Sequence, residues 1–450
     1  MRRGTGGGQA MNRRRGRQLS STALLGLLVL AACGGNGNDP GPNVANVNAA
    51  KRGGYDEQFA TNEKFSAVAA DEGRAAEVGR DILRNGGNAV DAAVAMYFVM
   101  AATLPSAAGL GASGACVIQD SKNRNGESFV FAPLAAPGPI KGVTFTVPTG
   151  PRAMALMHVR HGVARWEMDV APGEKLARFG FRVSRALARD LRSAQLDGEA
   201  RRVLTRNGAP LGEGDTLVEN DLAATLGVIR QRGAADFFQG NLARVMSEQV
   251  AQLGGNLPVE ALRGAIPQSG PPLAESYYGY RVYAAPAPAG GQSALAAWNG
   301  ASSSGAAGAS GDSGGFSGFA AFDDKGGAAA CSLSMGQLFG SRQMVPGTGV
   351  MLGAMSDIGG ISPVVVGNTN NGEFKFAGGG GGSPSSAYAV GAVARSTLRD
   401  SQRLGAALAA RAGQGGFVSA IACPNGKGKS ETCSAGVDRA SGGLAAVASD

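Results

Sequence analysis

The sequence has very few histidines, since His158 and His161 are the only two among its 450 residues. It also has no Cys-x-x-Cys pair among its five cysteines. Transition metals in proteins are bound mainly by clustered histidine and cysteine side chains. We therefore expect no metal site and no other cofactor. Both histidines fall in a segment expected to be helical, and we interpret them as helix-surface or structural residues.

Aromatic residues and basic clusters are also scarce. Phe, Trp and Tyr make up 6% of the chain, whereas glycine provides 73 residues, a composition that favours close backbone packing. The formal net charge of +8 includes six arginines that precede Cys33, so the rest of the chain is only slightly basic. No Lys/Arg run and no basic patch interleaved with aromatics follows. We therefore expect no nucleic-acid partner.

The N-terminus has the pattern of a bacterial lipoprotein signal. Basic residues in Arg13–Arg17 precede the apolar run Leu24–Leu30, which is too short to span a bilayer, and the run ends in Leu-Ala-Ala-Cys33. This predicts a signal peptide over residues 1–33, lipidation of the cysteine, and a flexible tether over residues 34–63. We expect a lipid-anchored protein that faces the periplasm from the outer membrane of a bacterial cell envelope. A plain signal peptide with an incidental cysteine is the alternative.

Four cysteines remain after the signal, and export permits disulfides. Cys423 and Cys433 flank the turn-rich sequence Pro-Asn-Gly-Lys-Gly-Lys, so a local disulfide between them is the expected pairing. Cys116 and Cys331 both lie in apolar runs. We expect these two to be buried thiols, unless their strands turn out to be adjacent.

The body of the chain divides into a mostly helical part and a strand-rich part. Residues 64–298 contain several helical patterns, including a nearly all-apolar one from Ala89 to Ala102 that should be buried. Residues 299–318 form a Gly/Ser-rich spacer that we expect not to order itself. Residues 319–450 contain alternating strands and one long helix over about 385–410. This order predicts an α+β layered fold.

The spacer contains Gly-Asp-Ser-Gly-Gly, residues 311–315, the string found around the nucleophile of chymotrypsin-like serine proteases. That reading requires a histidine within hydrogen-bonding distance of Ser313 and a β-barrel framework. The two histidines lie instead on an expected helix. A match of five residues inside a Gly/Ser-rich spacer also arises easily by chance, so we do not favour the protease interpretation.

The order of short motifs over most of 64–450 resembles the γ-glutamyltransferase family (glutathione hydrolases) of N-terminal-nucleophile hydrolases. The most specific motif is Gly-Gly-Asn-Ala-Val-Asp-Ala-Ala-Val-Ala at Gly86–Ala95. The other matching segments are Ala67–Asp71, Gly109–Gly114, Ala135–Pro137, Asn220–Leu226, Gly233–Gly240, Tyr278–Tyr283, Pro286–Leu295, Asp323–Ala328, Phe339–Gly340, Pro346–Val350, Ile361–Pro363, Gly381–Ser383 and Gly436–Leu444.

The resemblance implies an αββα sandwich whose precursor cuts itself before a hydroxyl residue at the start of a strand. The freed residue then attacks a γ-glutamyl amide, as in glutathione, with its own α-amine as base. Backbone N–H groups stabilise the oxyanion, and an arginine holds the substrate carboxylate. The implied partner is a small γ-glutamyl molecule, and no cofactor is needed.

The nucleophile position of the family is difficult to find in this sequence. The family motif Thr-Thr-His-Phe/Tyr-Ser-Val-Val-Asp, anchored without gaps on Asp323, puts Phe316 at the nucleophile position. Ser317 is one residue later and on the opposite strand face. With a short insertion, Ser313 takes the nucleophile position instead. Ser313 and Ser317 are therefore both catalytic candidates, and the absence of a nucleophile remains an alternative.

Other site positions of the family are partly retained. The resemblance assigns substrate or oxyanion roles to Ser332, Ser334, Asp357, Gly381 and Gly382, although ordinary strand and turn polarity also explains the first three. Several substrate positions differ, because the family residues are replaced by Pro133, Gly336, Gly359 and Gly360. Two hypotheses follow: a γ-glutamyl hydrolase or transferase, or a catalytically degenerate lipoprotein that keeps the sandwich as a binding or structural module.

Overall fold

The computed structural model describes residues 57–59, 64–122, 125–302 and 314–448. Every described residue belongs to one compact unit, Ala50–Asp450. The predicted signal peptide with Cys33, most of the predicted tether, and Ser313 therefore lie outside the described residues. Within the described ranges, no helix has the length and apolar character needed to cross a membrane.

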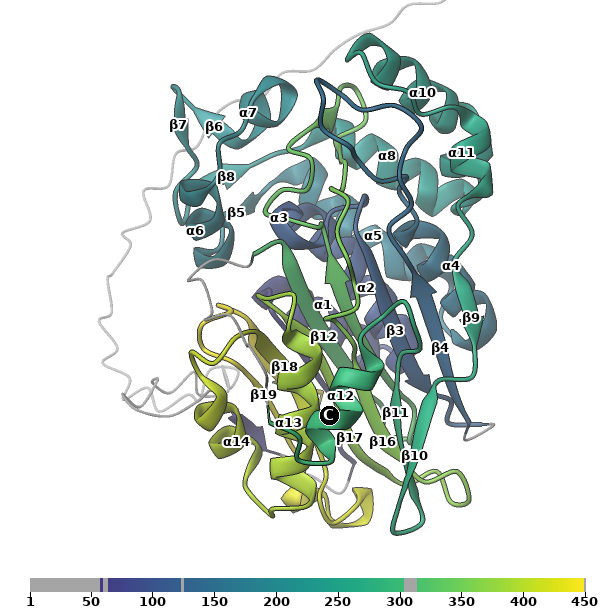
Figure 1. Ribbon diagram of the computed structural model, residues 1–450, viewed down its shortest axis with the longest axis vertical. Helices are drawn as coiled ribbons and strands as arrows, with labels where there is room; N and C mark the ends of the chain where they lie inside the picture. The colour runs from purple at the N-terminus through teal and green to yellow at the C-terminus, as the bar shows by residue number, and fades with distance from the viewer. Residues whose placement is uncertain (1–56, 60–63, 123–124, 303–313, 449–450) are drawn as a thin grey trace, which may run out of the picture. The chain divides into compact units, whose positions relative to one another are not determined.

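Two antiparallel sheets of seven strands each lie face to face at the centre of the fold (Figure 1). The sheet that we call the β12 sheet has the order β20 (Leu444–Val447), β2 (Ala67–Ala70), β12 (Phe316–Phe322), β13 (Ala328–Ser334), β3 (Ser113–Gln119), β4 (Gly126–Phe131) and β9 (Gln268–Gly270). The sheet that we call the β17 sheet has the order β1 (Glu57–Phe59), β19 (Ser434–Val437), β18 (Phe417–Ala422), β17 (Phe374–Gly381), β16 (Val364–Gly367), β11 (Tyr280–Ala284) and β10 (Leu273–Tyr277).

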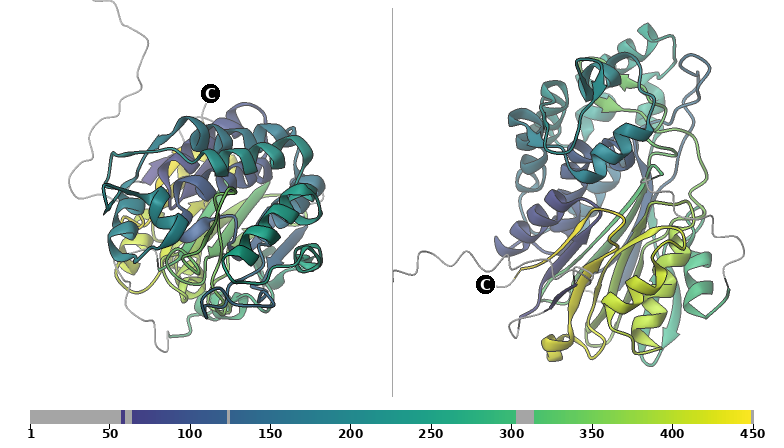
Figure 2. Two further views of the ribbon diagram at one scale, coloured as in Figure 1. Left: turned by 90° about the horizontal axis from the view of Figure 1, so that it is seen from above. Right: turned by 90° about the vertical axis from the view of Figure 1, so that its left-hand side faces the viewer.

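Helices cover the outer face of each sheet. Helices α1 and α2 lie on the β12 sheet, and α5 and α8 pack outside them. The helices of this part are α1 (Gly73–Arg84), α2 (Ala89–Thr103), α3 (Pro105–Ala108), α4 (Gly150–His161), α5 (Trp166–Phe179), α6 (Arg185–Ser193), α7 (Gly198–Leu204), α8 (Asn220–Arg232), α9 (Ala235–Gln239), α10 (Asn241–Gln252) and α11 (Val259–Gly264). The β17 sheet is covered by α12 (Gly291–Trp298), α13 (Ser386–Leu398) and α14 (Leu404–Arg411). The right-hand view of Figure 2 shows the purple and yellow helices on opposite sides of the strands.

This arrangement is an αββα sandwich, so the predicted fold class is confirmed. The remaining short elements are the hairpins β5 (Phe181–Arg182) with β8 (Thr216–Leu217), β6 (Thr205–Arg206) with β7 (Ala209–Pro210), and β14 (Met344–Val345) with β15 (Val350–Met351), and the 3-10 turn η1 (Lys427–Thr432).

The helix α2 is the central helix of the β12 side, and its sequence explains where it begins. The Asn88 side chain accepts hydrogen bonds from the backbone N–H groups of Val90 and Asp91, while the Asp91 carboxylate accepts one from the N–H of Asn88. This reciprocal capping box satisfies backbone donors that the first helical turn leaves free. Every residue of α2 is buried, because β12 and β13 lie on one side and α1 and α5 on others.

The two sheets touch each other directly at a glycine-rich point. A Cβ atom on Gly379 of β17 would lie 2.2 Å from the carbonyl oxygen of Cys331 in β13. One on Gly318 of β12 would lie 2.5 Å from the backbone nitrogen of Gly380. Only glycine fits at such distances. The backbones of the two sheets are therefore in contact where β12 begins.

Three expectations from the sequence are wrong in detail. The spacer predicted over residues 299–318 includes Phe316 to Gly318, which form the first part of β12 because they pair with β13. The long helix predicted over about 385–410 is broken into α13 and α14. Cys116 and Cys331 are directly opposed on the neighbouring strands β3 and β13 and form a disulfide rather than two free thiols.

Candidate active site

The start of β12 is where the family would place its nucleophile, and we call Phe316, Ser317 and Gly318 the β12 head. Phe316 lies opposite Ser334 of β13, and Gly318 lies opposite Ser332. Because opposed residues point to the same face and successive residues alternate, this set faces the β17 sheet. Phe316 is only 5% exposed and packs in the core between the sheets. An apolar ring thus occupies the position that the family motif assigns to the nucleophile.

Among the three residues of the β12 head, Ser317 carries the side-chain hydroxyl. By register its side chain starts on the other strand face, opposite Leu333, which packs toward the helices. Its Oγ nevertheless donates a hydrogen bond to Oδ2 of Asp71 at 3.3 Å. The same carboxylate accepts bonds from the Gly318 N–H at 2.8 Å and from the Ser419 hydroxyl at 2.8 Å. Asp71 therefore joins the β12 head to strand β18 of the opposite sheet.

The Asp71 carboxyl group follows directly after β2 and is buried. Burial raises the pKa of Asp71 to about 6, and the carboxylate of Asp438 adds to this, while the hydrogen bonds from Ser419, Gly318 and Ser317 oppose it. Asp71 is therefore mostly ionised at neutral pH but able to take up a proton. The sequence reasoning did not identify Asp71 as a site residue. Its signals in the sequence are an acidic residue directly after an apolar strand and its place at the end of the family-matching segment Ala67–Asp71.

The glycine pair at the end of β17 contacts the β12 head through its backbone. The N–H of Gly382 donates to the carbonyl oxygen of Phe316 at 2.9 Å. The N–H of Gly380 donates to Oγ of Ser332, also at 2.9 Å. A Cβ on Gly381 would lie 2.5 Å from Cα of Ser317. The predicted oxyanion residues Gly381 and Gly382 thus adjoin the peptide bond between Phe316 and Ser317.

The other predicted substrate residues are less well placed. Ser334 accepts a hydrogen bond from the N–H of Gly336 in its own strand-to-turn connection. Asp357 is exposed and accepts one from the N–H of Gly359 two residues later, which is a local turn contact. A Cβ on Gly360 would lie 1.4 Å from the carbonyl oxygen of Pro384, so no side chain fits there. Ser332 is therefore the one predicted substrate hydroxyl that directly contacts the glycine run.

The two histidines lie at the other end of β12. His161 has one ring nitrogen 2.7 Å from Oδ2 of Asp120 and the other 2.7 Å from Oε2 of Glu127. It lines a pocket together with Asp323, which follows the last residue of β12. Asp323 is seven residue steps from Phe316 along the strand, or roughly 23 Å at about 3.3 Å per residue. The histidine needed for a serine-protease triad is thus absent from the described surroundings of the β12 head.

Comparison with known proteins agrees with this architecture. The chain resembles the glutathione hydrolase proenzyme of Escherichia coli with 34% identity over 251 residues, and that of Bacillus subtilis with 30% over 254 residues. Each alignment covers 51% of this chain and 43% of the relative, so the chain spans less than half the length of these curated relatives.

Among solved structures, the cephalosporin acylase of Bacillus halodurans covers 85% of this chain at a TM-score of 0.68 and 19% identity, with 96% of that protein covered. The structure of LmbA2991T421A covers 86% of this chain at a TM-score of 0.66 and 14% identity, with all of that protein covered. At these identities the likeness concerns the fold. The family model described as Gamma-glutamyltranspeptidase matches residues 75–303, which is about half of the sequence. The chain therefore belongs to the gamma-glutamyltranspeptidase family.

Proposed function

We propose that this protein hydrolyses or transfers γ-glutamyl amides of the glutathione type, with Ser317 as an N-terminal nucleophile that the chain generates by cutting itself. The substrate class comes from the relatives, two of which are named glutathione hydrolase proenzymes. The choice of Ser317 comes from the β12 head. Its hydroxyl donates to Asp71, and the carbonyl of the preceding residue accepts the N–H of Gly382. This pairing of a hydroxyl, a carboxylate and a polarised carbonyl is the observation that carries the proposal.

Self-cleavage would proceed in two steps, transfer of the acyl group from nitrogen to oxygen and then hydrolysis of the resulting ester. Oγ of Ser317 attacks the carbonyl carbon of Phe316 and passes its proton to Asp71, while the N–H of Gly382 holds the negative oxygen. The C–N bond then breaks, and the nitrogen of Ser317 takes the proton, which leaves an ester. Water hydrolyses the ester, so residue 316 ends in a carboxylate and Ser317 gains a free α-amine.

The cleaved form would act on substrate with the same groups. The α-amine of Ser317 takes the proton of its own hydroxyl, which attacks the γ-glutamyl carbonyl. Departure of the Phe316 carbonyl leaves the N–H of Gly382 available for the substrate oxyanion. The leaving amine receives the proton, and water or a second amine then releases the γ-glutamyl group. Ser332 lies on the adjoining strand and supports the glycine run through its bond to Gly380.

The N-terminal residue of the small fragment tests this proposal. We expect the purified protein to yield two chains on denaturing electrophoresis once the Cys116–Cys331 disulfide, which joins the two sides of the cut, has been reduced. The smaller chain should begin at Ser317, and the protein should release p-nitroaniline from γ-glutamyl-p-nitroanilide. Ser317→Ala should abolish both. Ser313→Ala is the matched control, because it removes the other candidate hydroxyl four residues earlier and should leave both intact. A fragment that begins at Ser313, or cleavage that survives Ser317→Ala, contradicts the choice of Ser317.

A second candidate function is a non-catalytic binding or structural module. The observation that favours it is Phe316, whose buried ring occupies the family's nucleophile position. It predicts a single uncut chain and no release of p-nitroaniline by the wild type. Phe316→Thr then provides an informative variant, because it restores a hydroxyl on the face that carries Ser332. Gain of cleavage in that variant would mean that only the nucleophile has been lost.

We also propose that the protein is a periplasm-facing lipoprotein of the bacterial cell envelope, anchored through Cys33 in the outer membrane. The support is the Arg-rich segment, the short apolar run and the Leu-Ala-Ala-Cys sequence. We expect the wild type to incorporate labelled fatty acid and to fractionate with membranes. Cys33→Ala should remove the label and leave the protein unattached to lipid. Equal labelling of both would refute lipidation at this cysteine.

A further inference from the structure

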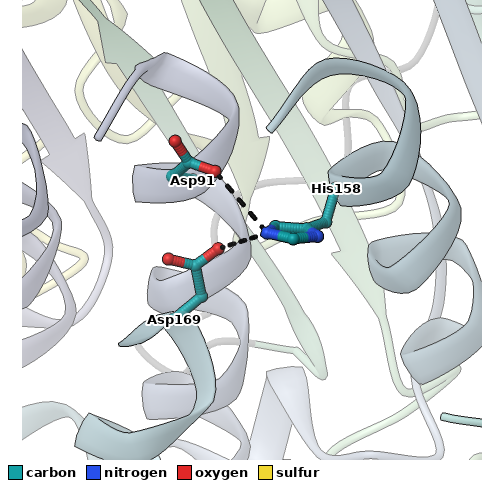
Figure 3. A group of neighbouring side chains, drawn as sticks. All are labelled: Asp91, His158 and Asp169. Carbon is teal, nitrogen blue, oxygen red and sulfur yellow. Dashed lines mark ion pairs between the residues drawn. The ribbon is translucent and has the colours of Figure 1, made fainter. Parts of the chain in front are cut away.

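Three polar side chains meet in the helical layer away from the β12 head (Figure 3). Asp91 comes from α2, His158 from α4 and Asp169 from α5. The Nε2 atom of His158 lies 3.6 Å from Oδ2 of Asp169 and 3.9 Å from Oδ1 of Asp91. One nitrogen and two carboxylate oxygens thus lie within 4.8 Å of one another.

Asp169 is the unusual member of this group. It has no exposed surface, and neither of its carboxylate oxygens has a hydrogen-bond partner among the residues that the structure describes. A buried carboxylate without hydrogen bonds is strongly unfavourable unless a positive charge or a proton compensates it. Figure 3 shows its carboxylate directed at the ring of His158. A cationic species between these groups would supply what Asp169 lacks.

The two carboxylate oxygens of Asp91 differ in how many hydrogen bonds they accept. Its Oδ2 accepts hydrogen bonds from the N–H groups of Asn88, Val163 and Ala164. Within the described ranges, its Oδ1 accepts a hydrogen bond from the shared N–H of Val163 alone, at 3.1 Å, and it is the oxygen that faces His158. A carboxylate oxygen has two lone pairs, so Oδ1 keeps one for a further partner on the His158 side.

We propose that Asp91, His158 and Asp169 bind one divalent transition-metal ion, with Zn²⁺ as the first ion to test. Imidazole nitrogen and carboxylate oxygen are both common zinc ligands. Two carboxylates supply the negative charge that balances the ion. With bonds of about 2.0–2.2 Å, ligand atoms of a tetrahedral site lie about 3.3 Å apart. The ligand atoms, which lie 3.6 Å to 4.8 Å apart here, would therefore have to approach one another by roughly 0.3 to 1.5 Å.

The ring of His158 could bind a metal ion only through a nitrogen that carries no hydrogen. Its Nε2 lies 3.1 Å from the carbonyl oxygen of Ala164, where a protonated nitrogen would donate. A bound ion would take the place of that proton, and Nδ1 would then carry the ring hydrogen. The His158 side chain is 14% exposed, whereas both aspartates are buried. Metal entry from the His158 side is therefore expected.

The position of this cluster indicates a structural rather than a catalytic metal. Asp91 belongs to the cap of α2, and the N–H of Ala89 in the same turn donates to Asp323 just after β12. The cluster is thus near the end of β12 that lies away from Phe316. The ion would join α2, α4 and α5, and its binding does not depend on which residue is the nucleophile.

The test is a zinc titration of the purified chain after treatment with a chelator. We expect one equivalent of Zn²⁺ per chain by calorimetry and by elemental analysis, and a higher thermal midpoint with zinc than without it. Asp169→Leu and Asp169→Asn should each weaken the affinity for zinc at least tenfold and remove the thermal shift. Asp169→Leu fills the same space without a charge, and Asp169→Asn keeps the shape, so at least one is expected to fold.

His161→Gln is the matched control. It removes the other histidine of the same helix, which pairs with different carboxylates, and it should bind zinc as tightly as the wild type. The proposal is overturned if the wild type binds no stoichiometric zinc, because the three residues then form only an ion-pair cluster. It is equally overturned if both folded Asp169 variants retain wild-type affinity, because the ion then lies elsewhere.

Discussion

Replacement of Asp71 by Asn should remove a specific part of the pH dependence of stability. Asp71 is buried between the sheets, and its pKa rises from 3.8 to about 6 in the folded chain. An acid whose pKa is raised on folding stabilises the protein fully below its unfolded pKa, and this contribution is lost as pH rises through the folded pKa. The affected window therefore runs from about pH 4 to about pH 6.

The size of the effect follows from the shift. At 1.36 kcal/mol per pKa unit, ionisation of Asp71 costs the folded state about 3 kcal/mol by pH 7.5. An Asn side chain of similar shape does not titrate. Its amide can still accept from Gly318 and donate to Ser419. We therefore expect the stability of the wild type, relative to Asp71→Asn, to fall by about 2 to 3 kcal/mol between pH 4 and pH 7.5.

Urea unfolding followed by the fluorescence of Trp166 and Trp298 measures this difference. Both proteins carry Ser317→Ala, so that neither cuts itself, and they are unfolded at several pH values from 4 to 8. The free energies are then subtracted at each pH. The subtraction cancels the titration of other buried acids such as Glu219, whose pKa burial raises to about 8. A difference that stays constant across this range would refute the assigned burial and pKa of Asp71.

Three further predictions concern the disulfides, the sheet contact and self-cleavage. In a Ser317→Ala background, which keeps the chain uncut, Cys331→Ala opens a loop of 215 residues and should lower the free energy of unfolding by about 5 kcal/mol. Cys433→Ala in the same background opens a loop of 10 residues and should lower it by about 3 kcal/mol, and denaturant unfolding compares the two. Gly379→Ala should lower the free energy of unfolding by about 3 kcal/mol or more, because its Cβ would meet the backbone of Cys331. Gly264→Ala, whose Cβ would enter open space, should change the free energy of unfolding by less than about 1 kcal/mol in the same assay. If Asp71 accepts the Ser317 proton, the rate of precursor cleavage should rise as pH increases through about 6. Electrophoresis of the precursor at intervals after a change of pH measures this rate, and a rate independent of pH between 5 and 8 would exclude that role.

The fold could be predicted from the sequence because its strongest signals are local, or are short motifs that follow one another in the order typical of the family. Asn88, a residue type favoured at helix starts, directly precedes the apolar run from Ala89 to Ala102, and the structure begins α2 at Ala89. Pairings between distant segments leave no such signal. The disulfide between Cys116 and Cys331 depends on β3 and β13 being neighbours, and the composition of residues 316–318 gives no indication that they pair as a strand.

The candidate site could be predicted only in part for the same reason. Gly381 and Gly382 were identified through family motifs, and they do adjoin the start of β12. Asp71 is 246 residues from Ser317 in the chain, and only the sheet brings them together. Asp169 gave no sequence signal either, because metal ligands are recognised in a sequence mainly as closely spaced cysteine and histidine residues. Its partners come from two other helices.

The glycine contact between the two sheets also limits how this region can open. Most binding sites adapt by rotating side chains, but the backbones of Gly379 and Gly318 meet with no side chain between them. Changes of side-chain rotamer therefore cannot open a space between the two sheets at this point. A substrate could reach the carbonyl-binding N–H of Gly382 only if a strand end is displaced. Cleavage before Ser317 would free such an end, so in this protein the cut that creates the nucleophile would also create the entrance.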